Sequence, residues 1–227
     1  MKNKVETKRM RRKIDVRFWF VALFSLLILV IYKFYPGETN NLFQGIVTSV
    51  ILMVILPTLF IKIILKDSLK EYGFNIPLNW KSVLIFCVML ILAVVLFAGM
   101  FKLTPLHYKY GLNVVDVSRS FKLFLISEVV TAFSLLIIVE IFFRSFIQSF
   151  LEQYFVPYKA ILLQVIYFFL VIYFWERNNF WEWPVFSLIF IAPFAGWVKW
   201  KTDSWIYSWL LVCLFLIISD SIILKLK

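Results

Sequence analysis

Long apolar stretches, separated by short polar segments, recur along the whole chain. They cover residues 16–35, 42–65, 82–101, 122–154, 158–175, 184–200 and 205–224. A helix needs about 20 mostly apolar residues to cross the hydrocarbon core of a bilayer. The pattern therefore predicts an all-α fold, a polytopic membrane bundle of about seven transmembrane helices. The fourth stretch is longer than the core is thick, so its helix must tilt or protrude.

The stretches leave room for one domain. Residues 1–15 form a basic tail, and residues 16–227 form the transmembrane domain. With a cytoplasmic N-terminus, sixteen Lys and Arg residues fall on the inner side and eight on the outer side. Positive residues are enriched on the cytoplasmic side of membrane proteins. We therefore predict a multi-pass protein of the cell membrane with its N-terminus in the cytoplasm.

Composition narrows the class of protein. Apolar residues make up 63% of the chain and charged residues 16%, whereas soluble domains carry about 25% charged residues. This excludes a soluble enzyme, a secreted disulfide scaffold and a disordered chain. Cys87 and Cys213 lie within apolar runs, which is typical of buried apolar cysteines rather than a metal or redox pair. The net charge of +11 fits topology and contact with membrane lipids, and no nucleic-acid-binding module is present.

The clearest candidate for chemistry is Glu140 with Arg144 in the fourth stretch. Spacing of four residues places both side chains on one helix face, in the order that favours an ion pair. Charged residues inside a membrane mark either a functional site or a self-neutralising pair that determines helix packing. The pair alone leaves both interpretations open. Gln164 of the fifth stretch is a candidate partner that could reach the pair.

Several fragments together suggest a family. Glu140-x-x-x-Arg144 with Leu151-Glu152 downstream resembles the first motif of the CPBP family of CAAX proteases and bacteriocin-processing enzymes. The segment 69–74 is similar to the short cytosolic segment of that family. Gly196 and the turn 202–205 resemble its glycine-rich helix and its last turn. The resemblance covers about residues 66–220 and implies a CPBP-like core.

The resemblance also implies intramembrane proteolysis by a Glu, two His and an Asn, which activate water and bind the oxyanion. Apolar residues occupy all four of these positions, namely Val139, Ile172, Val212 and Leu216. The one histidine, His107, lies in a predicted loop. Of the motif residues, only Glu140 and Arg144 remain. We expect them to be structural.

We therefore predict a non-catalytic protein that binds a membrane-protein or lipid-anchored partner. The alternative is a divergent intramembrane CAAX-type endopeptidase or a bacteriocin self-immunity protease that uses Glu140 as its base. Arg144 disfavours this alternative, because a neighbouring cation lowers the basicity of a carboxylate. A transporter is a weaker candidate, since no inverted repeat is visible. No cofactor is expected. No metal is expected either, since the stretches hold no cluster of zinc ligands.

Overall fold

The computed structural model describes residues 14–34, 42–75, 77, 79–103, 136–175 and 183–225. These residues are all-helical, and no strand occurs among them. In chain order the helices are α1 (Val16–Phe34), α2 (Leu42–Val50), η1 (Ile51–Ile55), α3 (Leu56–Leu59), η2 (Phe60–Leu65), η3 (Leu69–Tyr72), α4 (Trp80–Leu103), η4 (Ile141–Gln148), α7 (Ser149–Tyr154), α8 (Pro157–Trp175), α9 (Trp183–Thr202) and α10 (Trp205–Lys225). The segments η1, η2 and η4 are π-helical, and η3 is a 3₁₀ helix.

The predicted stretches agree with these helices to within two residues at every described end. The start of α4 shows how local residues determine where a helix begins. Asn79 accepts a hydrogen bond from the backbone N–H of Ser82 at 2.8 Å, which satisfies one free donor of the first turn. Pro157 opens α8, where the missing N–H of proline is harmless. Of the predicted stretch 122–154, residues 136–154 are helical, and residues 122–135 lie outside the described part.

Among the described residues, five helices are long and apolar enough to cross a membrane. They are α1, the continuous helix Gln44–Leu65, α4, and the apolar parts of α8 and α10. Large apolar side chains stand exposed along α1, α4 and α8. Water would disfavour such a surface, whereas hydrocarbon solvates it. These are the features of a helical membrane protein.

The helix through residues 42–65 continues past Pro57. Proline cannot donate the backbone hydrogen bond of an α-helical turn, and π-helical segments lie on both sides of it, in η1 and η2. The hydroxyl of Thr58 donates to the carbonyl of Val54 at 2.6 Å. The altered turns thus let the span accommodate Pro57 without a break.

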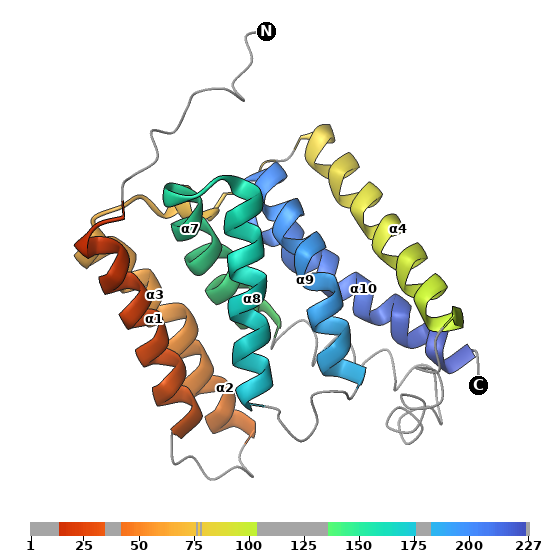
Figure 1. Ribbon diagram of the computed structural model, residues 1–227, viewed down its shortest axis with the longest axis horizontal. Coiled ribbons are helices and arrows are strands. Elements are labelled where there is room, and N and C mark those ends of the chain that lie inside the picture. Colours follow the sequence, from red (N-terminus) through yellow and green to blue (C-terminus); the bar gives the residue numbers. More distant parts are fainter. Residues whose placement is uncertain are drawn as a thin grey trace, which may run out of the picture.

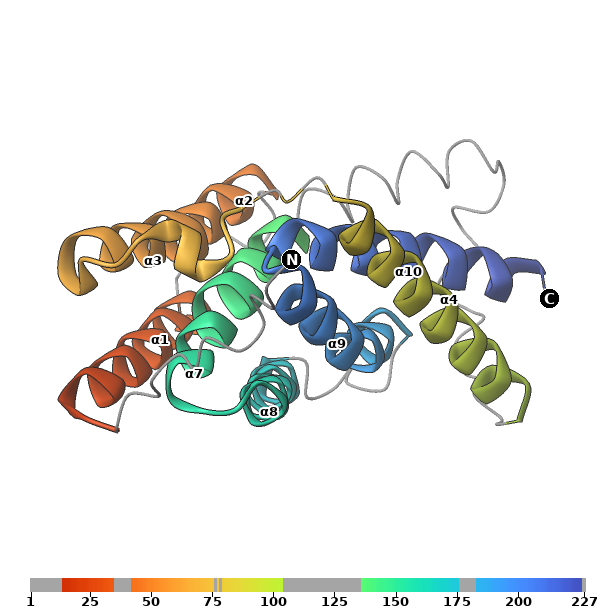
Figure 2. The ribbon, with the colours of Figure 1, turned by 90° about the horizontal axis from the view of Figure 1, so that it is seen from above.

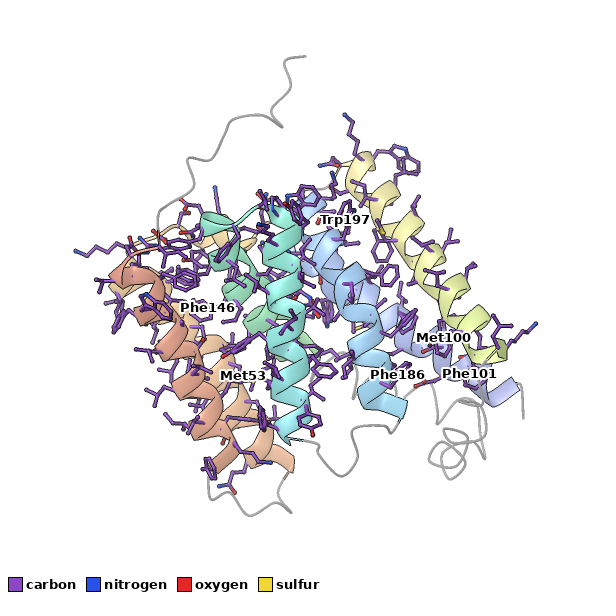
Figure 3. The ribbon with its side chains drawn as sticks, in the orientation of Figure 1. Met53, Met100, Phe101, Phe146, Phe186 and Trp197 are labelled. Carbon is purple, nitrogen blue, oxygen red and sulfur yellow. The ribbon has the colours of Figure 1, made fainter. Side chains whose placement is uncertain are left out.

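Two apolar clusters form the core. The first joins α1, the 42–65 helix, η4, α7 and α8, and the second joins α4, α9 and α10. Figure 3 shows Phe146 and Met53 on the side of the first cluster, and Met100, Phe101 and Phe186 on the side of the second. The segment η4–α7 and helix α9 lie between the two sides (Figure 2), so side chains on them can reach both.

The helices run alternately up and down. In Figure 1 the N-terminal ends of α1, α4, α8 and α10 lie at the upper end, together with the C-terminal ends of α7 and α9. We call this the polar end of the bundle, because five interacting polar side chains occupy it: Arg17, Asp67, Tyr72, Glu152 and Lys199. The candidate residues Glu140 and Arg144 lie further from this end, at the start of η4 and within it.

Candidate functional site

Glu140 and Arg144 form a buried pair, as their spacing predicts. Glu140 directly precedes η4, and Arg144 lies one turn later. The Nε atom of Arg144 is 3.5 Å from Oε2 of Glu140, and the two residues are 1% and 3% exposed, respectively. This separation is an ionic contact without hydrogen-bond geometry, and within the part of the chain that the structure describes Nε and Nη1 of Arg144 have no hydrogen-bond partner. The two charges compensate each other, but the Nε and Nη1 donors of the guanidinium have no acceptor among the described residues.

A third residue completes the pair from another helix. Ser208 of α10 donates its hydroxyl hydrogen to Oε2 of Glu140 at 2.5 Å. The guanidinium of Arg144 lies 5.7 Å from the ring centre of Phe168 on α8, in a cation–π contact. The pair therefore joins η4 to both α10 and α8.

The four positions at which the resemblance implies catalytic residues carry apolar side chains that pack in the core. Val139 and Ile172 pack in the first core cluster, and Val212 and Leu216 pack in the second. None of these side chains can take up a proton or donate a hydrogen bond. Because Oε2 of Glu140 already accepts from Ser208 and faces Arg144, this carboxylate is poorly disposed to act as a general base.

The structure also locates two other candidate polar residues, Gln164 and Asp220. The hypothesis that Gln164 contacts the pair is wrong for hydrogen bonding, because both amide atoms of this fully buried residue have no hydrogen-bond partner in the described part of the chain. Asp220 is buried, but it follows Ser208 by twelve residues on α10, about 18 Å along the helix axis. His107 lies outside the described residues.

A second ion pair, in which the lysine is fully buried, was not predicted. The sequence placed Lys199 on the inner side only as a topological charge, but Lys199 is 0% exposed and its Nζ lies 2.8 Å from Oε2 of Glu152. Gln148 donates through Nε2 to Oε1 of Glu152 at 2.9 Å and to the carbonyl of Gly196 at 2.8 Å. Lys199 lies within the predicted stretch 184–200, about one turn before α9 ends at Thr202.

Four polar residues form one row that begins directly before η4 and continues into α7. Glu140, Arg144, Gln148 and Glu152 follow one another at intervals of four, and we call this row the polar stripe. In an α-helix a row of this spacing winds around the axis. The wider turn of the π-helix in η4 offsets that drift and keeps the stripe on one side. The spacing of four was the sequence signal that could have identified Gln148 and Glu152.

The polar end also binds the segment before α4. Arg17 forms an ion pair and hydrogen bond with Asp67, and Asp67 accepts from the hydroxyl of Tyr72 at 3.1 Å. Burial raises the pKa of Tyr72, and the nearby carboxylate of Asp67 raises it further. The phenol therefore stays protonated and donates. Arg17, counted in the sequence as part of the basic N-terminal region, thus anchors α1 to the segment after η2.

The fragments that carry the family resemblance meet at this end. Ser145 donates to the backbone carbonyl of Tyr72 at 2.5 Å, and the N–H of Trp205 donates to the carbonyl of Gly73 at 3.3 Å. Gly73 has a φ of +78°, a conformation that suits glycine. Segments 69–74, 140–152 and 196–208, which are far apart in the sequence, therefore form one bonded unit.

The cysteines are not a pair. Cys213 is buried, as predicted, but the expectation of burial is wrong for Cys87, which is exposed on α4. An apolar thiol can face lipid there at little cost. Among the described residues, no three His, Cys, Asp or Glu side chains gather where they could bind a metal ion.

The chain was also compared with known proteins. No family model, no curated protein and no solved structure matches it.

Proposed function

We propose that the chain is a non-catalytic membrane protein with a CPBP-like helix core of seven spans and a cytoplasmic N-terminus. The observation that carries this proposal is that the side chain of Glu140 is buried and already bound by neighbouring side chains. The residue is 3% exposed, and its carboxylate accepts from Ser208 and faces Arg144. The positions of the family base and oxyanion donors are apolar. In this arrangement the pair connects helices and does not activate water.

The proposed role is to hold another membrane-embedded segment. The outer side of α4 offers a place for it, because only 11% of its most apolar part is buried, against 22% in α1 and 56% in α10. Exposed side chains follow one another on α4 at intervals of four, three and four residues: Leu84, Val88, Ile91 and Val95. This spacing is typical of a seam that packs against another helix.

Cross-linking through Cys87 tests the binding role. Cys87 is exposed on α4, whereas Cys213 is buried, so a thiol-reactive photocrosslinker attaches selectively to α4 in native membranes. We expect one membrane protein or lipid-anchored peptide to cross-link stoichiometrically. In the control, Leu23→Cys in a Cys87→Ser background places the same probe on the exposed side of α1, where we expect lipid adducts only.

The outcome separates the alternatives. Adducts to lipid alone at both positions would contradict the partner role. Loss of the partner adduct in Val88→Trp, with α1 labelling unchanged, would support the α4 seam as its binding surface. The divergent protease is tested separately, by cleavage, because a protease releases its substrate and leaves no stoichiometric adduct.

A further inference from the structure

Five buried polar atoms on or beside the polar stripe have no hydrogen-bond partner among the described residues. They are Nε and Nη1 of Arg144, Oε1 of Gln148, and both amide atoms of Gln164. All three residues are 0–1% exposed. A buried polar atom without a partner destabilises a fold by about 1–3 kcal/mol, so five of them in one region indicate that something else satisfies them.

The five atoms belong to facing surfaces of η4 and α8. Arg144 contacts Phe168 on α8. A Cβ placed on Gly196 of α9 would lie 3.2 Å from Oε1 of Gln148 and 3.0 Å from Cγ2 of Ile161 on α8, so Gln148 and Ile161 border the same point beside Gly196. Gln164 lies three residues after Ile161 and four before Phe168, on the same face of α8. Its amide therefore lies between the levels of Gln148 and Arg144.

Charge determines what the region can bind. Arg144 is compensated by Glu140, and Lys199 is compensated by Glu152. An anion or a cation would therefore bring an uncompensated charge into an apolar interior, which is strongly unfavourable. The free atoms comprise three donors and two acceptors. A neutral group that both donates and accepts suits this set.

We propose that the polar stripe holds an internal water site between η4 and α8, bound by Arg144, Gln148 and Gln164. Buried waters make about three hydrogen bonds each, so the five atoms fit about two water molecules. The site hydrates the guanidinium of Arg144 within the bundle. It also couples the two buried ion pairs of the stripe through Gln148, which bonds Glu152 with its amide nitrogen and water with its amide oxygen.

Radiolytic labelling with ¹⁸O water tests this proposal on the full chain in detergent micelles. An X-ray pulse converts bound water into hydroxyl radicals that oxidise the nearest side chains. Phe168, in contact with Arg144, is the reporter. Phe215 is the control, because it is 0% exposed and packs between the rings of Phe97 and Phe190 in the second core cluster. We expect ¹⁸O on Phe168 and none on Phe215.

Two variants connect the label to the site. Gln164→Leu removes two of the five polar atoms at similar volume, and we expect Phe168 to lose most of its label. Gln164→Asn keeps an amide, and we expect it to retain the label. Phe215 must stay unlabelled in both variants, which shows that the bundle remains closed. Phe168 as unreactive as Phe215 in the wild type, or equal Phe168 labelling in the Leu and Asn variants, would overturn the proposal.

Discussion

Removing one partner of the Glu152–Lys199 pair should strongly destabilise the bundle. Lys199 is fully buried and its Nζ lies 2.8 Å from Oε2 of Glu152. Lys199→Met leaves the carboxylate with only the amide of Gln148, and Glu152→Leu leaves a buried ammonium ion with no counter-charge. Loss of one partner of a buried ion pair costs about 3–5 kcal/mol in the free energy of unfolding, so we expect a loss of that size for each single variant.

The double variant distinguishes this reasoning from a simple loss of contacts. In Glu152→Leu/Lys199→Met no charge remains unpaired. Gln148 also keeps its 2.8 Å hydrogen bond to the carbonyl of Gly196. Replacing a buried pair with apolar residues is often neutral. We therefore expect the double variant to be more stable than either single variant, by about 2 kcal/mol or more.

Thiol reactivity in mixed micelles provides the assay. In a Cys87→Ser background, the buried Cys213 reacts with a maleimide dye only on unfolding, so titration with a denaturing detergent gives the free energy. Lys159→Met, at an exposed lysine on α8, is the control and should change stability by less than about 0.5 kcal/mol. Single variants as mild as this control, or a double variant as unstable as the two losses combined, would refute the reasoning.

Three further contacts are examined with the same assay, two of them with a control variant. Gly196→Ala places a Cβ 3.0 Å from Ile161 and 3.2 Å from Gln148 and should destabilise the α8–α9 contact by about 1–3 kcal/mol. Gly99→Ala, whose Cβ meets nothing within 4 Å, should be neutral or slightly stabilising in comparison. Ser208→Ala removes the donor to Glu140 and should lower stability by about 1–3 kcal/mol, whereas Ser221→Ala, whose hydroxyl bonds only within α10, should not. Arg17→Met breaks the partly exposed pair with Asp67 and should lower the free energy of unfolding by about 1 kcal/mol. This loss should shrink at high salt. A loss independent of salt would contradict an ionic origin.

The spans could be predicted because their physical signal is local. An apolar run of sufficient length identifies a membrane helix with no knowledge of its neighbours. The pair Glu140 and Arg144 was equally accessible, since residues four apart on a helix share a face. Its third member, Ser208, was not, because nothing in the sequence states that α10 presents this serine to η4.

The burial of Lys199 shows where sequence reasoning fails. A lysine near the end of a membrane helix usually extends its side chain to the interface. Only the packing of α9 against η4 and α7 places Glu152 within reach and turns Lys199 inward. The prediction that Cys87 is buried also fails. An apolar run does not distinguish the side of a helix that faces lipid from the side that faces protein.

Cleavage by a variant that keeps the fold tests the non-catalytic role of Glu140 most directly. Glu140→Leu/Arg144→Met removes both buried charges together, so neither is left uncompensated and the bundle should remain folded. The measurement compares cleavage of membrane-anchored peptides by equal amounts of folded wild-type and variant protein. The account predicts no cleavage above background from either. Cleavage by the wild type that disappears in the folded variant would contradict it and identify Glu140 as the base of an active protease.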